Sequence, residues 1–186
     1  MLSQICSKYN SDKDSLGYAD IYERLFDRNW KRILEFGVLH GGSLRAWKEW
    51  FPGASIHGVD NNQEMDVLSR VGEEEGFRLH FGDVRDEKFM EKLVANVGVV
   101  DLLIEDSRHA SDGQRNVFDF FKNSIAPGGL LVIEDIPIDH DGVTQTVPEY
   151  WLGPVSGKGR FDPSPLTLVG NFLCPRTRLW IWRNDG

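Results

Sequence analysis

Carboxylates and a histidine gather in two short stretches of the chain. One reads Ile-Glu-Asp-Ser-Arg-His over residues 104–109, and the other reads Ile-Glu-Asp over residues 133–135. Both follow apolar runs typical of strands, so the acids stand at strand ends. Unpaired carboxylates a few ångströms apart raise one another's pKa, and a divalent cation relieves that repulsion. Oxygen ligands suit Mg²⁺ or Mn²⁺. As a set the acids predict a metal site, whereas a single one is better explained by solvation or an arginine partner.

His109 follows Asp106 by three residues. At that spacing its imidazole can reach a hydroxyl group at the metal site while the carboxylate holds the ion. We therefore predict that His109 is a general base and that Asp106 shares the catalytic role. The other histidines are interpreted as incidental, although one of them lies in the glycine-rich loop described next; they are His40, His57, His80 and His140.

A second chemical signal is the glycine-rich stretch at 34–43, Leu-Glu-Phe-Gly-Val-Leu-His-Gly-Gly-Ser. Glycines let the backbone turn tightly and approach a ligand at the start of the next helix. The spacing is E-x-G-x-x-x-G, formed by Glu35, Gly37 and Gly41, and not the G-x-G-x-x-G of dinucleotide binders. It makes less provision for a pyrophosphate, which favours S-adenosylmethionine over NAD.

Acidic residues also end the next two predicted strands. Asp60 stands about twenty residues beyond the glycines, where a carboxylate would accept hydrogen bonds from both ribose hydroxyls. Asp83 follows the third strand and is placed to meet an adenine edge. Each signal alone is better explained by plain turn geometry. With Glu35 they place acids at three successive strand ends, which predicts a cofactor crevice.

The elements that must position these residues alternate between strands and helices. Apolar runs predict strands at 32–36, 54–59, 77–81, 99–104 and 130–133, and amphipathic segments between them predict helices at 43–50, 64–75, 87–96 and 112–124. Such alternation predicts an α/β fold with a Rossmann-like doubly wound sheet of about seven strands, mostly parallel. Segments 166–169 and 178–182 leave no room for a helix between them and are predicted to form an antiparallel C-terminal hairpin.

Length and composition agree with one domain over residues 1–186. Residues 1–30 are predicted to form an N-terminal helical cap, with helical spacing over 17–27, and residues 137–165 a lid or substrate loop. A net charge of −8 argues against nucleic-acid or membrane partners. Cys6 and Cys174 are expected to be inert thiols. With no signal peptide or membrane span recognised, a cytoplasmic location is expected.

The chain resembles the metal-dependent sugar O-methyltransferases of macrolide biosynthesis, the mycinamicin-type family of class I S-adenosylmethionine-dependent enzymes, and is also similar to the cephalosporin hydroxylase-like group. The resemblance rests on Lys-Tyr-Asn-Ser-Asp-Lys at 8–13, Tyr-Glu at 22–23, Glu-Phe-Gly at 35–37, Gly-Gly-Ser-Leu at 41–44, Pro-Gly-Gly at 127–129 and Ile-Glu-Asp at 133–135. It implies methyl transfer to a hydroxyl of a sugar or glycoside, in natural-product or polysaccharide biosynthesis.

The resemblance also implies a site. His109 and Asp106 would be catalytic, and the metal ligands would be Asp106, Glu134 and Asp135. The residues predicted to bind the cofactor are Ser11, Lys13, Glu35, Gly37, Gly41, Ser43, Asp60, Asn61, Asp83 and Glu105. One departure is that Ser107-Arg108 stands where the family usually has Gly-Ser, which adds bulk and charge beside the metal.

Other functions stay open. A catechol or phenol O-methyltransferase would use the same metal and cofactor. An iron oxygenase usually presents two histidines and one carboxylate, but this stretch offers one histidine. A non-catalytic cofactor-binding protein would bind S-adenosylmethionine without turnover.

Tyr150 and Trp151 are candidates to stack on a sugar. The sequence leaves a homodimer open, with Trp180 and Trp182 as a candidate contact that is more simply explained as core.

Overall fold

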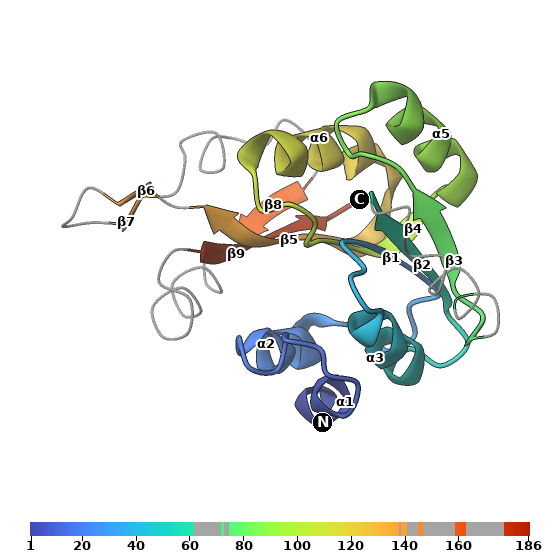
Figure 1. Cartoon of the computed structure of the whole chain (residues 1–186), viewed down its shortest axis with the longest axis vertical. Helices are drawn as coiled ribbons and strands as arrows, with labels where there is room; N and C mark the ends of the chain where they lie inside the picture. The colour runs from blue at the N-terminus through green and yellow to red at the C-terminus, as the bar shows by residue number, and fades with distance from the viewer. Residues whose placement is uncertain (62–71, 73–74, 138, 141–144, 147–158, 163–176) are drawn as a thin grey trace.

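The computed structural model describes the chain apart from six gaps. Described residues are 1–61, 72, 75–137, 139–140, 145–146, 159–162 and 177–186. Within them lies a seven-stranded sheet in the order β3-β2-β1-β4-β5-β9-β8, flanked by helices on both faces (Figure 1). The predicted doubly wound, mostly parallel α/β sheet is confirmed.

Most strands of the main sheet occur where apolar runs predict them, with boundaries that shift by a residue or two. The exceptions are the strand predicted at 130–133, which spans 125–137, and a strand at 159–162, in a segment predicted to be a loop. The strands of this sheet are β1 (Arg32–Phe36), β2 (Ser55–Asp60), β3 (Arg78–Phe81), β4 (Val100–Glu105), β5 (Ile125–Pro137), β8 (Gly159–Asp162) and β9 (Thr177–Asn184). The first five pair in parallel, and β9 runs antiparallel to both of its neighbours, β5 and β8. Strand β5 is the longest because it continues through the acids at 134–135.

Two layers of helices cover the sheet. Helices α1 (Leu2–Lys8), α2 (Tyr18–Leu25) and α3 (Gly42–Trp50) lie on one face, while α5 (Glu87–Val97) and α6 (Ser111–Phe121) lie on the other (Figure 1). A short 3₁₀ turn, Lys122–Ser124, continues α6 into β5. Side chains alternate between the two cores, so that Leu102 and Ile104 face the first layer and Leu103 faces the second.

Local chemistry sets the helix ends near the site. Asp86 caps α5 by accepting hydrogen bonds from the backbone N–H groups of Lys88 and Phe89, at 3.0 and 3.3 Å. Gly41 begins α3 with a positive φ of 73°, a conformation that glycine adopts without strain. The glycine-rich loop can therefore turn directly from β1 into a helix whose first turn faces the crevice.

The C-terminal part of the chain differs from prediction. Within the 137–165 segment, predicted to be a loop, β8 joins the main sheet, and β6 (Asp139–His140) pairs with β7 (Gln145–Thr146). The sequence does not reveal β8, because four-residue Gly-Arg-Phe-Asp is too short to show alternation and pairs with only one strand, β9. That residues 137–165 serve as a lid or substrate loop stays a prediction. The predicted helix 64–75, hairpin strand 166–169, Tyr150 and Trp151 lie outside the described residues, wholly or almost wholly.

Trp180 and Trp182, considered above as a dimer contact, are 1% and 3% exposed. Both pack edge-to-face on Phe118 of α6. The core interpretation is therefore confirmed, and the idea of an exposed aromatic contact was wrong. Among the residues that the structure describes, none of the helices combines the length and apolar character that a bilayer crossing requires.

Candidate active site

The candidate site lies where the strand order of the sheet reverses, between β1 and β4. Strands β1 and β4 are neighbours, but the next strands in sequence lie on opposite sides of them, so a crevice opens at their carboxyl ends. The loops that follow β1 and β4 touch there, since a Cβ added at Gly37 would lie 2.0 Å from the backbone oxygen of Asp106. Only glycine allows this approach. The backbone N–H of Asp106 donates to the carbonyl of Phe36 at 3.0 Å, which ties the loops together.

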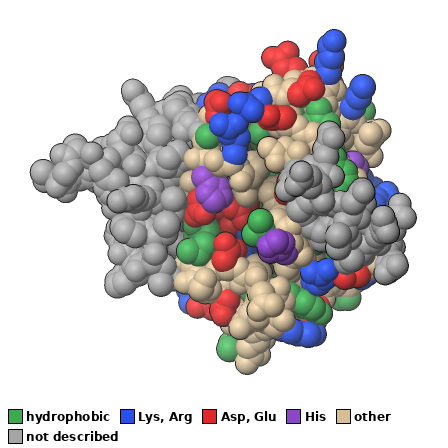
Figure 2. All heavy atoms as spheres, in the orientation of Figure 1, with side chains coloured by type: hydrophobic (Ala, Val, Ile, Leu, Met, Phe, Trp, Pro, Cys, Tyr) green, Lys and Arg blue, Asp and Glu red, His purple; other side chains and the backbone are tan. Residues whose placement is uncertain are grey.

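A cleft of about 710 Å³ occupies this edge of the sheet. That volume is in the range of small-molecule sites. Figure 2 shows acidic and histidine side chains gathered on this hollowed face. The predicted site residues that line the cleft are Ser11, Lys13, Gly37, Ser43, Asp60, Asn61, Asp106 and His109. The cleft thus brings together residues from the N-terminal segment, the glycine-rich loop and the ends of β2 and β4.

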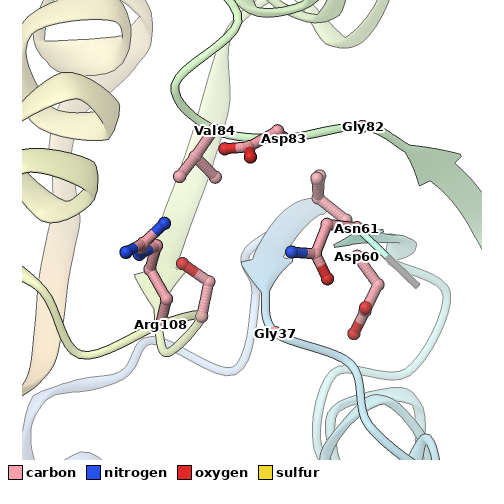
Figure 3. Close-up of a pocket in the computed structure, with 9 residues that line it drawn as sticks. Gly37, Asp60, Asn61, Gly82, Asp83, Val84 and Arg108 are labelled. Atoms are coloured by element: carbon pink, nitrogen blue, oxygen red, sulfur yellow. The ribbon is translucent and has the colours of Figure 1, made fainter.

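A smaller pocket continues beside the cleft, between the ends of β1, β2, β3 and β4 (Figure 3). Asp60 and Asn61 lie on one side of it, with Val84 and Arg108 on the other. The lining also includes Asp83, so this pocket contains two of the acids predicted to meet a nucleoside.

Both of these acids already have partners on the protein. One carboxylate oxygen of Asp60 accepts hydrogen bonds from the backbone N–H groups of Val38 and Leu39, at 3.0 and 3.2 Å. Asp83 forms an ion pair with Arg85 at 2.6 Å, and this arginine lowers the pKa of Asp83 to about 2. Asp60 therefore holds the glycine-rich loop in shape, and Asp83 stays ionised at neutral pH.

Lys13 lies at the centre of a group of buried charges. Its ammonium is 2.8 Å from Asp106, 2.9 Å from Glu134 and 3.2 Å from Glu35, and its side chain is only 1% exposed. Burial by itself lowers the pKa of a lysine, but the carboxylates outweigh it and hold the Lys13 pKa well above its ordinary value. Lys13 therefore stays protonated and joins the N-terminal segment to β1, β4 and β5.

Glu35, predicted to bind the cofactor, is turned into the core. One oxygen accepts hydrogen bonds from the Ser43 hydroxyl at 2.6 Å and the Trp47 indole N–H at 3.1 Å, and the residue is fully buried. Burial raises the pKa of its carboxyl, against the opposing effect of Lys13. Its contacts stabilise the start of α3.

Glu134 and Asp135 leave β5 at an irregularity. The pairing of β5 with β9 shifts between residues 133 and 136, and Asp135 has a φ of +50°. Consecutive residues of a regular strand point to opposite faces. Here both carboxylates reach α2, where Tyr22 donates to Glu134 and Tyr18 donates to Asp135, each at 2.6 Å. A bulge that redirects one side chain explains this arrangement.

Three side chains form a group that could hold a cation. Asp106, His109 and Asp135 each offer a ligand atom, and these atoms lie within 4.8 Å of one another. His109 Nε2 is 3.1 Å from Asp106, and Nδ1 is 3.6 Å from Asp135. His109 also has a positive φ of 50°, so two of the three members occupy a strained backbone conformation. Such strain is often found at functional sites.

Charges around this group shift its titration. Burial alone would raise the pKa of Asp106, but Lys13 and His109 lower it below its ordinary value. The Asp106 carboxylate accepts a hydrogen bond from the His109 ring and so raises the pKa of His109, and Asp135 adds to that effect. Asp106 is therefore ionised at neutral pH, and the His109 imidazole is more basic than a free one.

Glu134, predicted as a metal ligand, lies outside this group of three. One oxygen accepts from Tyr22 and the other from Lys13, and burial raises its pKa well above the ordinary value. The structure thus brings together Asp106, His109 and Asp135, whereas Glu134 is linked to Asp106 through Lys13, which contacts both.

Two further predicted cofactor residues do not line the cleft. Glu105 is fully buried and accepts hydrogen bonds from the backbone N–H and hydroxyl of Ser107, and burial raises its pKa to about 7. Gly41 contributes its turn at the start of α3. Glu105 and Gly41 therefore shape the loops after β4 and β1 and do not line the cleft.

Sequence reasoning missed the tyrosines as partners of the acids. Both tyrosines lie in the 17–27 segment, which the sequence predicts only as part of a helical cap. They are fully buried, but their hydroxyls also bind the acids of β5. Their four-residue spacing was the available signal, since it places two hydroxyls on one helix face. Gln114 was also missed; its side chain donates to the Glu134 carbonyl at 2.9 Å.

The chain is similar to several characterised enzymes. It is 32% identical to mycinamicin VI 2''-O-methyltransferase of Micromonospora griseorubida, over 73% of this chain and 36% of that protein. It is 29% identical to demethylmacrocin O-methyltransferase of Streptomyces fradiae, over 92% of this chain and 43% of that protein. The chain therefore spans well under half the length of these curated relatives. The predicted resemblance to macrolide sugar O-methyltransferases is confirmed.

Solved structures agree. The MycE methyltransferase from the mycinamycin biosynthetic pathway, in complex with Mg and SAH, has a TM-score of 0.62 at 32% identity, over 72% of this chain and 36% of that one. A fibrillarin/Nop5p complex reaches 0.63 at 14% identity, over 89% and 79%, and shows the shared Rossmann-like fold alone. A family model described as a methyltransferase domain matches residues 34–136, more than half of the chain, and the protein therefore belongs to this methyltransferase family.

Proposed function

We propose that the protein transfers the methyl group of S-adenosylmethionine to a hydroxyl of a sugar or glycoside, with a divalent cation, Mg²⁺ or Mn²⁺, at the site. One observation carries this proposal: a single cleft is lined both by Asp60 and Asn61 and by Asp106 and His109. A cofactor with its ribose near Asp60 and an acceptor near His109 would share this space. Positioning two reactants side by side is a large part of catalysis in group transfer.

The cation is proposed from the chemistry of the donor set. Asp106 and Asp135 provide carboxylate oxygens, and His109 lies between them. Hard divalent cations prefer oxygen ligands, so these two aspartates would hold the ion. Glu134, the third predicted ligand, contacts Lys13 at 2.9 Å and Tyr22 at 2.6 Å and does not belong to this group. MycE, a similar protein, is described in complex with Mg.

The roles of the chain's own residues follow from their contacts. A bound cation would supply Lewis acidity to the acceptor hydroxyl. His109 would accept the hydroxyl proton, because its imidazole is 46% exposed and is oriented by Asp106 at 3.1 Å. Tyr18 and Lys13 would hold Asp135 and Asp106 in place from behind. The acceptor oxygen would then attack the sulfonium methyl group, forming the O–C bond as the S–C bond breaks and S-adenosylhomocysteine leaves.

A sugar is favoured as the acceptor by the relatives. The names of the similar proteins specify sugar or glycoside hydroxyls on macrolide and related compounds, as in L-olivosyl-oleandolide 3-O-methyltransferase of Streptomyces antibioticus, 29% identical over 90% of this chain and 43% of that protein. These names describe longer proteins. The assignment to this chain is therefore tested on the chain itself.

Calorimetric titration comes first. S-adenosylmethionine and S-adenosylhomocysteine are titrated into the protein with and without MgCl₂, for the parent, Asp60→Ala and Asp106→Ala. We expect micromolar cofactor binding that is lost in Asp60→Ala, and a Mg²⁺ response that is lost in Asp106→Ala. A folded parent that binds neither ligand contradicts the proposal.

Turnover is then measured as formation of S-adenosylhomocysteine with glycosides, with catechols and without acceptor. We expect activity with glycosides that EDTA abolishes and that His109→Ala reduces by about 10²–10⁴-fold, the usual contribution of a general base. Activity confined to catechols would move the assignment to a phenol acceptor. Cofactor binding without turnover on any acceptor would favour a binding protein.

A further inference from the structure

Arg108 forms one wall of the small pocket beside the main cleft. Its side chain rises along the pocket toward Val84 and faces Asn61 across the opening (Figure 3). It belongs to the loop after β4, two residues beyond Asp106. The pocket therefore contains an arginine that the proposed methyl transfer leaves without a role.

The stem of Arg108 is seated on the first turn of α6. A Cβ added at Gly113 would lie 3.4 Å from Arg108 Cγ, 3.5 Å from its Cδ and 3.1 Å from Val84 Cγ2. The bare backbone of Gly113 thus gives the arginine stem and the valine room to lie together. This packing orients the guanidinium along the pocket wall.

Two arginines lie near the pocket, and the charges of both lower the pKa of Asp83, but only Arg85 is hydrogen-bonded to it. Arg85 holds Asp83 through two side-chain hydrogen bonds, at 3.0 and 2.6 Å. Within the described part of the chain, the Arg108 guanidinium makes no hydrogen bond or ion pair, and its side chain is exposed. A planar cation on a pocket wall can therefore meet a ligand directly.

The charge of the pocket limits what that ligand is. Asp60 and Asp83 line the same small space as Arg108. Because Asp83 is already paired with Arg85, the Asp60 carboxylate offsets the charge of Arg108, and the pocket has no excess positive charge to attract a phosphate or another anion. A neutral aromatic ring needs no such excess charge. Guanidinium groups stack on aromatic faces, where the ring's π electrons attract the cation.

We infer that Arg108 stacks on the purine ring of the bound cofactor and so forms one face of its adenine pocket, with Asn61 on the opposite wall. This inference rests on the proposed function, because it takes S-adenosylmethionine as the ligand. It assigns to Arg108 a part in cofactor affinity that is separate from the metal group. Adenosine alone contains everything that this contact recognises.

The test is calorimetric titration of adenosine and S-adenosylhomocysteine into the parent, Arg108→Ala, Arg108→Lys and the control Arg115→Ala. Arg115 also lies on the surface, on α6, but pairs with Asp119 at 2.8 Å and does not line the pocket. We expect Arg108→Ala to weaken both ligands equally, by about three- to tenfold. Arg108→Lys should recover little of this, since it keeps the charge but loses the plane. Arg115→Ala should match the parent, and so should Mg²⁺ binding in Arg108→Ala.

Several results would overturn the inference. If Arg108→Ala or Arg108→Lys binds adenosine as tightly as the parent does, the guanidinium does not stack on the purine. If inorganic phosphate competes with adenosine in the parent but not in Arg108→Ala, Arg108 binds an anion instead. A folded parent that binds neither ligand overturns the proposed function itself, whereas a parent that binds both with Arg108→Ala unchanged overturns this inference alone.

Discussion

The carboxylates of this protein divide into two groups that differ in what neutralises them. Glu35 and Glu134 are buried and depend on Lys13, whose position in the sequence is remote from both. Asp60 and Asp83 line the crevice and are held by local groups, backbone N–H groups in one case and Arg85 in the other. Carboxylates near the ends of strands therefore differ in role: the buried pair stabilises the fold, and the crevice pair is proposed to contact the ligand.

Asp106 and Asp135 connect the two groups. Each contacts a buried residue on one side, Lys13 or Tyr18, and His109 on the other. Substitutions in the buried group should therefore mainly lower the free energy of unfolding, and substitutions at the crevice should mainly weaken ligand binding.

The largest expected effect is on stability. Lys13→Met removes the ammonium and leaves buried carboxyl groups without their counter-charge, which should lower the free energy of unfolding by about 3–5 kcal/mol. Urea denaturation measures it. The control Lys8→Met breaks an exposed pair with Glu49 and should leave the urea midpoint unchanged. Equal stability of parent and Lys13→Met would show that the buried group does not depend on this charge.

The next effect is on cofactor binding. Asp60→Asn keeps an oxygen that can accept from the glycine-rich loop but loses the charge, so S-adenosylhomocysteine should bind about 10–100-fold more weakly, as expected for lost hydrogen bonds to a charged group. Calorimetry measures the affinity, and the urea midpoint should move little. A large loss of stability with unchanged affinity would reverse the comparison between the two groups.

Asp135→Asn addresses the residues between the groups. Its amide oxygen can still accept from Tyr18, but a neutral side chain is a poorer ligand for a divalent cation. Mg²⁺ affinity should fall by about tenfold or more, measured by calorimetry. Asp112→Asn changes an exposed acid at the start of α6 and serves as the control. If Asp112→Asn has the same effect, Mg²⁺ is responding to overall charge and not to the group formed with Asp106 and His109.

The smallest effect on stability is expected from Arg85→Ala. Arg85 lowers the pKa of Asp83 from 3.8 to about 2, so this pair stabilises the fold above pH 3.8 and loses that contribution as the pH falls toward 2. Because this ion pair lies at the surface, with Arg85 exposed and Asp83 half-buried, the unfolding free energy at neutral pH should hardly change. NMR titration of the Asp83 carboxyl should show its midpoint return toward 3.8. A midpoint still near 2 would mean that other groups hold this acid.

Much of the site could be predicted because parallel strands carry their carboxyl ends to one edge of the sheet. Asp60 ends β2, whereas Asp106 and His109 both follow β4, and all three line one cleft. The direction in which a side chain points was harder to predict. Glu35 follows the same rule of position, yet its carboxylate turns inward to Ser43, Trp47 and Lys13.

By itself the sequence determined the alternation of strands and helices, the glycine-rich turn after β1 and the set of acids at strand ends, because these depend on local pattern and spacing. Only the tertiary structure decided that Lys13 lies buried among three carboxylates, 93 and 121 residues away from two of them. It also decided that a bulge in β5 turns Glu134 and Asp135 toward the same helix. Both features depend on which distant segments meet in space and on a backbone irregularity, and neither leaves a periodic mark in the chain.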